Sequence, residues 1–310
     1  MAQKDLSSKV LEAHNEIFAN IFNTFAFNGE QILNPDFLED EPTENIFLDI
    51  EGDYRNNMRD VFKSYKIEGA SSPVRLAYLG IENQTKLDKA MVVRILSYTA
   101  NCYKRQCDEI AITRRALNKQ LKLAKTESQK LFIEEELNRY SVDNIVPVIT
   151  LVLNFNKQKW EQNINLSELV KDSNPFKRYM HNFKIHVVNV LYLSDEEIEQ
   201  LTNDFKALVI LLAKQEATLE ELNYPLDVLM ALYAYTNDNR YLAKKNDILR
   251  KLSQGGKITM PEIYDEIQRK KAVMIAKNLI AMGELSFESI AKATDLPLEV
   301  VQELAKQTAA

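Results

Sequence analysis

Apolar residues recur at helical spacing near the start of the chain and form nearly continuous runs farther along it. From Val10 to Phe25 they follow one face of a helix, and Asn28-Gly29 supplies a left-handed stop. Shorter runs at 45–50, 55–67 and 74–84 then predict three strands. The third run is almost entirely apolar, which predicts a strand buried on both faces.

The second half of the chain turns from this mixed pattern to helices. A helical region is predicted from Leu87 to Tyr140, folded back near 126–128. Segments 146–155 and 183–193 are the remaining strand candidates, and from Ser194, which opens a capping box, the pattern is helical to the end. The order helix, three strands, helix, strand predicts an α/β fold with a mixed sheet flanked by helices.

This change of pattern predicts two regions, an α/β domain over residues 1–193 and a C-terminal helical region over residues 194–310. No uncharged apolar run approaches the roughly 18 residues that a membrane-spanning helix needs, so we expect no membrane contact. The start of the chain is polar and lacks the apolar stretch of a signal peptide. Cys102 and Cys107 are expected to be free thiols, which fits a cytoplasmic protein.

Charge narrows the candidate partners. The net charge of −6 argues against a general affinity for polyanions, so contact with nucleic acid requires a local basic surface. Residues 101–125 offer one, although a solvated helix face explains the same pattern. Its cations are Lys104, Arg105, Arg114, Arg115, Lys119, Lys122 and Lys125, against Asp108 and Glu109.

Candidate chemistry lies at the end of the third predicted strand. Glu82 and Gln84 are two residues apart, so their side chains point to the same face, and Asp60 is predicted to lie in the neighbouring strand. Such polar pairs often mark only the wet face of a strand. However, an uncompensated carboxylate on a buried central strand costs several kcal/mol, and a bound cation is one way to compensate it.

Two acids suffice for a magnesium site, because Mg²⁺ is commonly held by one or two carboxylates, waters and substrate phosphate. Asp60 and Glu82 would be the side-chain ligands, and the carbonyl of Asn83 would add a backbone oxygen. Gln84 would hydrogen-bond the attacking water or a phosphate. Mg²⁺ or Mn²⁺ held in this way would support phosphodiester hydrolysis.

These motifs resemble a known family. Arg59-Asp60-Val61 followed by Leu79-Gly80-Ile81-Glu82-Asn83-Gln84-Thr85 is similar to the PD-(D/E)XK nuclease-type putative transposases, the recombination-promoting nuclease family. The resemblance runs in order from about residue 10 to residue 305. Its other segments are 15–21, 27–29, 91–94 with Tyr98, Tyr103 and Gln106, 147–153, 182–185, 236–240 and 275–279.

The resemblance implies a magnesium-dependent DNA endonuclease with a restriction-endonuclease-like α-β-β-β-α-β core. Asp60 and Glu82 match its metal-binding acids, and Gln84 takes the position that holds lysine in most of the wider superfamily. Glutamine carries no charge and cannot act as a base, so the cation would activate the water and Gln84 would orient it. Asn20 also departs from the pattern, since related helices place an acid there; Glu16 is a substitute candidate.

Further candidates lie on the helix that follows the acidic strand. Arg94, Tyr98 and Gln106 are predicted to bind substrate or phosphate, with Arg94 the strongest candidate and helix packing the alternative for Tyr98. The C-terminal segments 286–293 and 296–304 resemble a helix-turn-helix. The second segment is acidic where a DNA-reading helix is basic, so packing or self-association is favoured.

The sequence therefore predicts a divalent-metal-dependent DNA endonuclease linked to recombination or mobile elements, acting as a homodimer if both strands are cut. The alternative is a catalytically decayed nuclease fold that binds DNA or protein as an assembly module, for which Gln84 and Asn20 are the motivation. An RNase on the same core is a third, weaker hypothesis.

Overall fold

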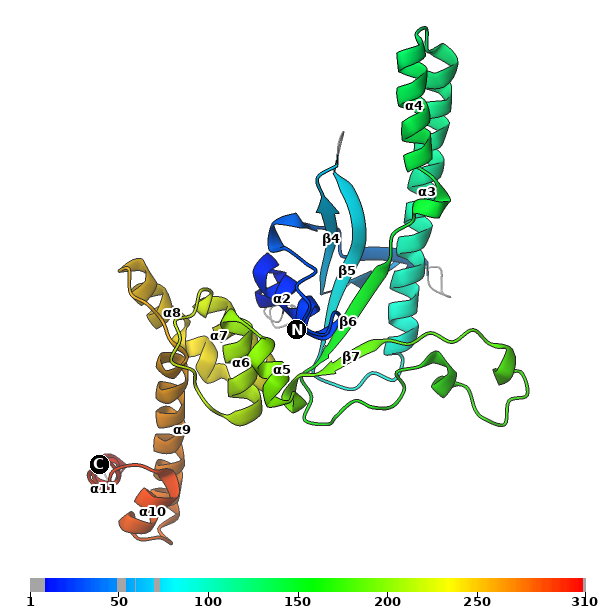
Figure 1. Cartoon of the computed structure of the whole chain (residues 1–310). Coiled ribbons are helices and arrows are strands. Elements are labelled where there is room, and N and C mark those ends of the chain that lie inside the picture. Colours follow the sequence, from blue (N-terminus) through cyan, green and yellow to red (C-terminus); the bar gives the residue numbers. More distant parts are fainter. Residues whose placement is uncertain (1–8, 49–53, 59, 70–72, 309–310) are drawn as a thin grey trace. The chain divides into compact units, whose positions relative to one another are not determined.

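The computed structural model describes residues 9–48, 54–58, 60–69 and 73–308 (Figure 1). Contacts between residues divide the chain into two units. One unit is Glu12–Leu201, and the other joins Thr202–Ala310 with Met1–Leu11.

A five-stranded mixed sheet forms the centre of the Glu12–Leu201 unit. Its strand order is β1-β4-β5-β6-β7, in which β1, β4 and β5 pair antiparallel whereas β5, β6 and β7 pair parallel. The mixed α/β fold predicted from the sequence is thereby confirmed. The strands are β1 (Leu38–Asp40), β4 (Val61–Ile67), β5 (Val74–Gln84), β6 (Val148–Asn154) and β7 (His186–Asn189).

Helices cover both faces of this sheet. On one face Lys63 of β4 lies over the Phe18 ring of α2 (Asn15–Phe25), with its ammonium 5.7 Å from the ring centroid. On the other face Phe62 and Tyr78 pack with Cys102 of α3 (Met91–Leu123). Helix α2, the strands, α3 and β6 therefore supply the predicted α-β-β-β-α-β order (Figure 1).

The prediction of one strand over residues 55–67 is wrong, because the segment forms two separate strands. β3 (Tyr54–Met58) pairs with β2 (Glu44–Leu48) in a separate two-stranded sheet, and only β4 joins the central sheet. Asp60 lies in the bend before β4, and Arg59 is outside the described residues. The edge strand β1 lies outside the predicted strands, because three residues are too few to form a periodic pattern.

The predicted fold-back of the long helix is confirmed. Helix α3 ends at Leu123 and α4 (Glu127–Arg139) returns beside it, with Thr126 and Gln129 forming a capping box. The Arg114 guanidinium donates hydrogen bonds to the carbonyl oxygens of Leu137 and Tyr140, at 2.6 and 2.8 Å, and so joins the two helices. In Figure 1 this hairpin projects beyond the sheet.

Helices also fill the rest of the chain, as predicted. Ser194 and Glu197 form the expected capping box, but the helix ends at Gln200 and a new one starts at Asn203. The helices are α5 (Asp195–Gln200), α6 (Asn203–Lys214), α7 (Pro225–Thr236), α8 (Asn239–Ser253), α9 (Met260–Met282), α10 (Phe287–Thr294) and α11 (Leu298–Thr308). Short 3-10 helices are η1 (Leu11–Ala13), η2 (Pro35–Phe37), η3 (Val142–Asn144), η4 (Leu166–Leu169), η5 (Lys177–Tyr179) and η6 (Val190–Tyr192).

The last three helices pack around a small apolar centre. Ile290 of α10 and Val301 of α11 are fully buried against Ala276 of α9. These contacts use the inner faces of the helix-turn-helix-like segment for packing. In the part of the chain that the structure describes, no helix is both long enough and apolar enough to cross a membrane.

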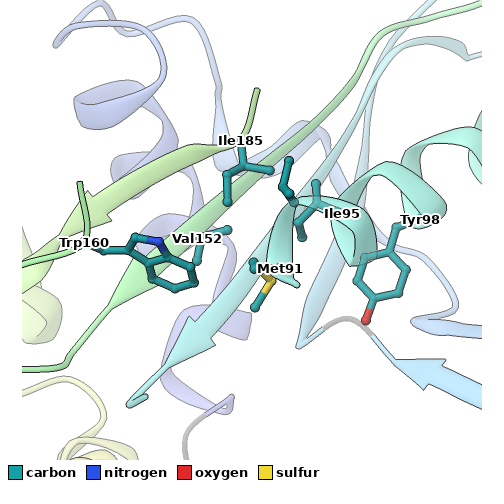
Figure 2. Packing of buried hydrophobic residues seen from close by; sticks show 7 residues of the cluster. Met91, Ile95, Tyr98, Val152, Trp160 and Ile185 are labelled. Carbon is teal, nitrogen blue, oxygen red and sulfur yellow. The ribbon is translucent and has the colours of Figure 1, made fainter. Parts of the chain in front are cut away.

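The core beside the sheet joins three distant segments. Met91 and Ile95 of α3 pack against Val152 of β6, and Trp160 and Ile185 close the cluster from the connection between β6 and β7 (Figure 2). Burial of these large apolar side chains stabilises each by about 1.5–3 kcal/mol relative to exposure. The cluster therefore fixes the first turns of α3 against the carboxyl ends of the central strands.

Candidate active site

Asp60 meets the end of β5 through a backbone contact. Its Oδ2 accepts a hydrogen bond of 2.6 Å from the backbone N–H of Asn83. The β4–β5 pairing ends at Val61 and Ile81, so the Asp60 carboxylate takes an N–H that continued strand pairing would otherwise occupy. This hydrogen bond explains why Asp60 leaves the strand and still lies next to the Glu82 position.

Glu82 is buried and carries a paired charge. Only 1% of its surface is exposed, and its Oε2 lies 3.2 Å from a guanidinium nitrogen of Arg94. Arg94 comes from the first turn of α3 and also reaches Asp88, at 3.5 Å. A buried carboxylate needs such a partner because desolvation penalises its charged form. The predicted neighbourhood of Glu82 and Arg94 is thus present.

The backbone of Asn83 faces the same side as Asp60. In an extended strand the N–H and C=O of one residue point to the same neighbouring strand, so the Asn83 carbonyl is also directed toward the β4 side. Gln84 ends β5 half-buried, beside Asn154 in the parallel register, and its carbonyl accepts a hydrogen bond of 2.8 Å from the Phe155 N–H. Two carboxylates and one carbonyl are oxygen donors of the kind that Mg²⁺ prefers.

Tyr98 and Gln106, which are predicted to bind substrate, contact the protein core and backbone. Tyr98 is 1% exposed and belongs to the core cluster of Figure 2. Gln106 lies twelve residues beyond Arg94 on α3, about 18 Å along the helix axis. Its amide brackets the Val146 backbone, accepting from the N–H at 2.9 Å and donating to the carbonyl at 3.2 Å. Gln106 therefore binds the Val146 backbone and Tyr98 is buried, and a substrate-binding role for either side chain stays a prediction.

A third acidic ligand does not join the pair within the described residues. No group of three or more histidine, cysteine, aspartate or glutamate side chains there is arranged to hold a metal ion. Asn20, at the position where the resemblance leads one to expect an acid, is buried and donates a hydrogen bond of 3.1 Å to the Gln200 carbonyl. Any cation at Asp60 and Glu82 would therefore rely on few protein ligands, as Mg²⁺ sites often do.

Two residues of the site escaped the sequence reasoning. Asp88 holds Arg94 and also forms a turn just before α3, where its Oδ1 accepts from the Ala90 N–H at 2.9 Å. Asn154 is fully buried at the end of β6 and donates to the Asn189 side chain at 2.8 Å. A polar residue directly after an apolar strand was the available signal for Asn154, as it was for Gln84.

The basic segment 101–125 is divided by the structure. Lys104 pairs with Asp108, Arg105 approaches Glu41 and Glu109, and Arg114 binds carbonyl groups of the hairpin. The cations nearer the end of α3 are exposed to solvent, and they are Arg115, Lys119 and Lys122. This outer part is therefore an exposed basic surface, either solvated or binding.

An α-β-β-β-α-β core with one acid near the end of its central strand and a second acid beside that end is the arrangement of the PD-(D/E)XK type. The family model described as "Putative transposase, YhgA-like" matches residues 39–240, which include β4, β5 and α3. The chain belongs to this family of putative transposases. Membership indicates a function connected with mobile DNA elements. Comparisons with curated proteins and with solved structures found no match.

Proposed function

We infer that the protein is a divalent-metal-dependent DNA endonuclease that hydrolyses phosphodiester bonds. The observation that carries this proposal is the hydrogen bond from the Asn83 N–H to Asp60, which draws one carboxylate to the residue next to buried Glu82. Membership of a family of putative transposases supplies DNA as the expected partner. Both acids lie near the carboxyl ends of the parallel strands β5 and β6, because Glu82 is on β5 and Asp60 contacts Asn83.

The oxygen donors of these residues are chemically suited to a divalent metal ion. Asp60, Glu82 and the Asn83 carbonyl would hold Mg²⁺ or Mn²⁺, which when bound supplies an activated water and neutralises charge on the phosphate. Arg94 would hold Glu82 in its charged form and present its remaining N–H groups to a phosphate oxygen. Gln84 would orient the attacking water with its amide, because it cannot accept a proton as a base.

Plasmid cleavage by the full chain tests this proposal directly. Wild-type protein should nick DNA with Mg²⁺ or Mn²⁺ and lose this activity in EDTA. Asp60→Asn and Glu82→Gln should each reduce the rate by at least about 100-fold, the scale for removing one group that stabilises transition-state charge. Glu134→Gln, at an exposed position of α4, is the matched control and should cleave like wild type. Equal nicking by wild type and both site variants would refute the assignment.

A second candidate function follows from the ion pair between Glu82 and Arg94. Arg94 gives the buried Glu82 carboxylate a counter-charge even without a metal ion. Gln84 lacks the charge of the lysine that most of the wider superfamily has there. A decayed nuclease core that binds DNA or protein as an assembly module is the resulting alternative. Calorimetry separates the two functions, because DNA binding without any heat of Mg²⁺ or Mn²⁺ binding would favour the alternative.

Oligomeric state belongs to the same proposal. A fold with one site per chain cuts both strands most directly as a homodimer, one copy for each strand. Light scattering on the DNA-bound protein, together with the ratio of linear to nicked plasmid, measures this. A monomer that only nicks would limit the activity to single-strand cleavage.

A further inference from the structure

A long connection between β6 and β7 has no role in the proposed chemistry. We define residues 155–185 as the arm; in Figure 1 it extends away from the sheet and returns to β7. Its only helical elements are the short 3-10 helices η4 and η5. Loops beyond about 12–15 residues without regular structure are uncommon in compact domains and often functional.

The base of the arm is firmly attached. Trp160 and Ile185, at its two ends, are 4% and 1% exposed and pack against Met91 and Ile95 of α3 (Figure 2). Backbone hydrogen bonds join the outgoing and returning segments, from the Leu166 N–H to the Phe183 carbonyl at 2.8 Å and from the Ile185 N–H to the Ile164 carbonyl at 3.0 Å. The two sides of the base therefore form one narrow stalk.

The stalk starts beside the candidate active site. The Asn156 side chain donates a hydrogen bond of 2.7 Å to the Thr85 carbonyl, directly after Gln84. A depression next to it is lined by Leu87 and Lys89, which precede α3, and by arm residues 158–163. Arg94 lies in the first turn of α3, directly after these two residues. A polymer held at the acids would therefore meet the arm as it leaves the site.

The tip of the arm, residues 170–181, presents two aromatic side chains. Phe176 and Tyr179 are 74% and 69% exposed. The Tyr179 N–H donates to the Phe176 carbonyl at 3.0 Å across the η5 turn, and side chains three residues apart in a 3-10 turn point the same way. Asn174 fixes the start of the turn, because its Oδ1 accepts from the Phe176 N–H at 3.0 Å. The two rings thus share one side of an ordered turn.

The same tip segment carries several cations. The tip contains Lys171, Lys177 and Arg178 against the one acid Asp172, in a chain whose net charge is −6. Asp172 pairs with Lys177 at 2.6 Å, whereas Lys171 and Arg178 make no ion pair within the described residues. The Arg178 guanidinium lies 4.8 Å from the centroid of the Tyr179 ring. The positive charge of the tip is therefore exposed next to its aromatic surface.

We propose that the tip of the arm is a second DNA-contact site, at which Lys171 and Arg178 bind backbone phosphates while Phe176 and Tyr179 stack on unpaired bases. Aromatic faces combined with cations suit single-stranded or distorted nucleic acid, because every base offers a face for stacking and every nucleotide a phosphate. The inference rests on the proposed function only in taking DNA as the partner. It assigns the tip a preference for DNA with unpaired bases near the cleavage position.

Fluorescence anisotropy in EDTA measures this contact without cleavage. The full chain is titrated with a labelled duplex and with the same duplex carrying a central unpaired bubble. The variant F176A/Y179A should bind the bubble DNA at least about fivefold more weakly than wild type, since each stacked base contributes about 1–3 kcal/mol. Binding of the intact duplex should weaken less. Phe132→Ala, 55% exposed on α4, is the aromatic control and should bind like wild type.

The cations give a second readout. The variant K171A/R178A should flatten the plot of log K against log salt by about 2, since each phosphate contact contributes roughly 0.9 to the slope. Lys277→Ala, an exposed cation of α9 without an ion pair in the described residues, should leave the slope unchanged. Wild-type affinity and slope in both tip variants would overturn the proposal. So would tip-dependent binding to phosphatidylserine vesicles with unchanged DNA binding, which would make the arm a membrane contact.

These results are separate from those that test the nuclease. If the chain binds DNA through the tip but does not cleave, the arm remains a DNA contact and the proposed activity fails. If Asp60 and Glu82 are needed for cleavage while F176A/Y179A and K171A/R178A both bind DNA like wild type, the activity stands and the arm proposal fails.

Discussion

The two ends of strand β5 carry charged clusters that differ in balance. At the amino end Tyr78 is buried, with the Arg75 guanidinium 4.5 Å and the Arg105 guanidinium 5.3 Å from its ring centroid. Glu41 lies 3.3 Å from Arg75 and 3.7 Å from Arg105. Glu109 adds a second acid near both arginines. Two cations and two acids therefore neutralise one another around a core aromatic ring.

The carboxyl end arranges its acids differently. Among the described residues there, Glu82 and Asp88 share Arg94, and Asp60 contacts the Asn83 backbone next to Glu82. Burial of charge is common to both ends of the strand, so it does not by itself indicate chemistry. A buried carboxylate next to a second acid at a strand end does suggest chemistry, because two carboxylates so placed could share a divalent cation. This difference separates a structural cluster from a candidate site.

Removing the Tyr78 ring tests the structural end and should have the largest effect on stability. Tyr78 stacks on Phe62, with ring centroids 5.5 Å apart and planes 12° from parallel. Tyr78→Ala should lower the free energy of unfolding by about 3–5 kcal/mol, because it leaves a cavity and removes the ring that two arginines contact. Urea denaturation measures this. A loss below about 1 kcal/mol would mean that this end does not stabilise the sheet.

Removing Arg94 tests the acid-rich end. Arg94→Ala leaves the buried Glu82 carboxylate without this counter-charge, which should cost about 1.5–3 kcal/mol in EDTA. If the acids hold a cation, added Mg²⁺ should recover most of that loss, since a ligand that binds only the folded state stabilises it. Thermal unfolding with and without Mg²⁺ measures both effects.

The double variant E82Q/R94A is the control for this experiment. It carries neither the buried charge nor its partner, so it should be more stable than Arg94→Ala in EDTA and indifferent to Mg²⁺. A Mg²⁺ response of the same size in the double variant would place the cation elsewhere. No Mg²⁺ response in Arg94→Ala would favour the decayed-nuclease alternative.

Local signals in the sequence predicted the framework of this site well. The apolar run at 74–84 matches β5 at both ends, and the fold-back near Thr126 and the Ser194 capping box fall where the structure has them. Each of these features is specified by residues that are neighbours in the chain, through burial period or cap chemistry. The predicted proximity of Asp60 to the end of β5 also agrees with the structure.

Non-local pairing accounts for what the sequence did not predict. Asp60 leaves its strand because an N–H at position 83 is available to its carboxylate. Gln106 is withdrawn from the site because its amide holds the backbone of Val146, forty residues away in the chain. The edge strand β1 exists through pairing with β4 rather than through its own three residues. No periodic pattern records such partners.

The smallest expected effect concerns the Tyr78 hydroxyl. Burial, partly offset by Arg75, raises the pKa of Tyr78 from 10.0 to about 12. Between these values the unfolded chain has released the proton while the folded protein keeps it, so stability falls as the pH rises. Below pH 10 the contribution is fully present, and it is lost as the pH approaches 12. Tyr78→Phe has no proton to lose there.

The pH dependence of Tyr78→Phe therefore isolates this group. At pH 8 the variant should be less stable than wild type by at most about 1.5 kcal/mol, the net value of one hydrogen bond. The gap should narrow from pH 10 upward, because only wild type loses the contribution of Tyr78. Tyr241 of α8, whose pKa burial also raises to about 12, titrates in both proteins and cancels in the difference. Parallel stability curves for the two proteins would show that the hydroxyl is as accessible to water as in the unfolded chain, and that the amino end of β5 is less tightly packed than its carboxyl end.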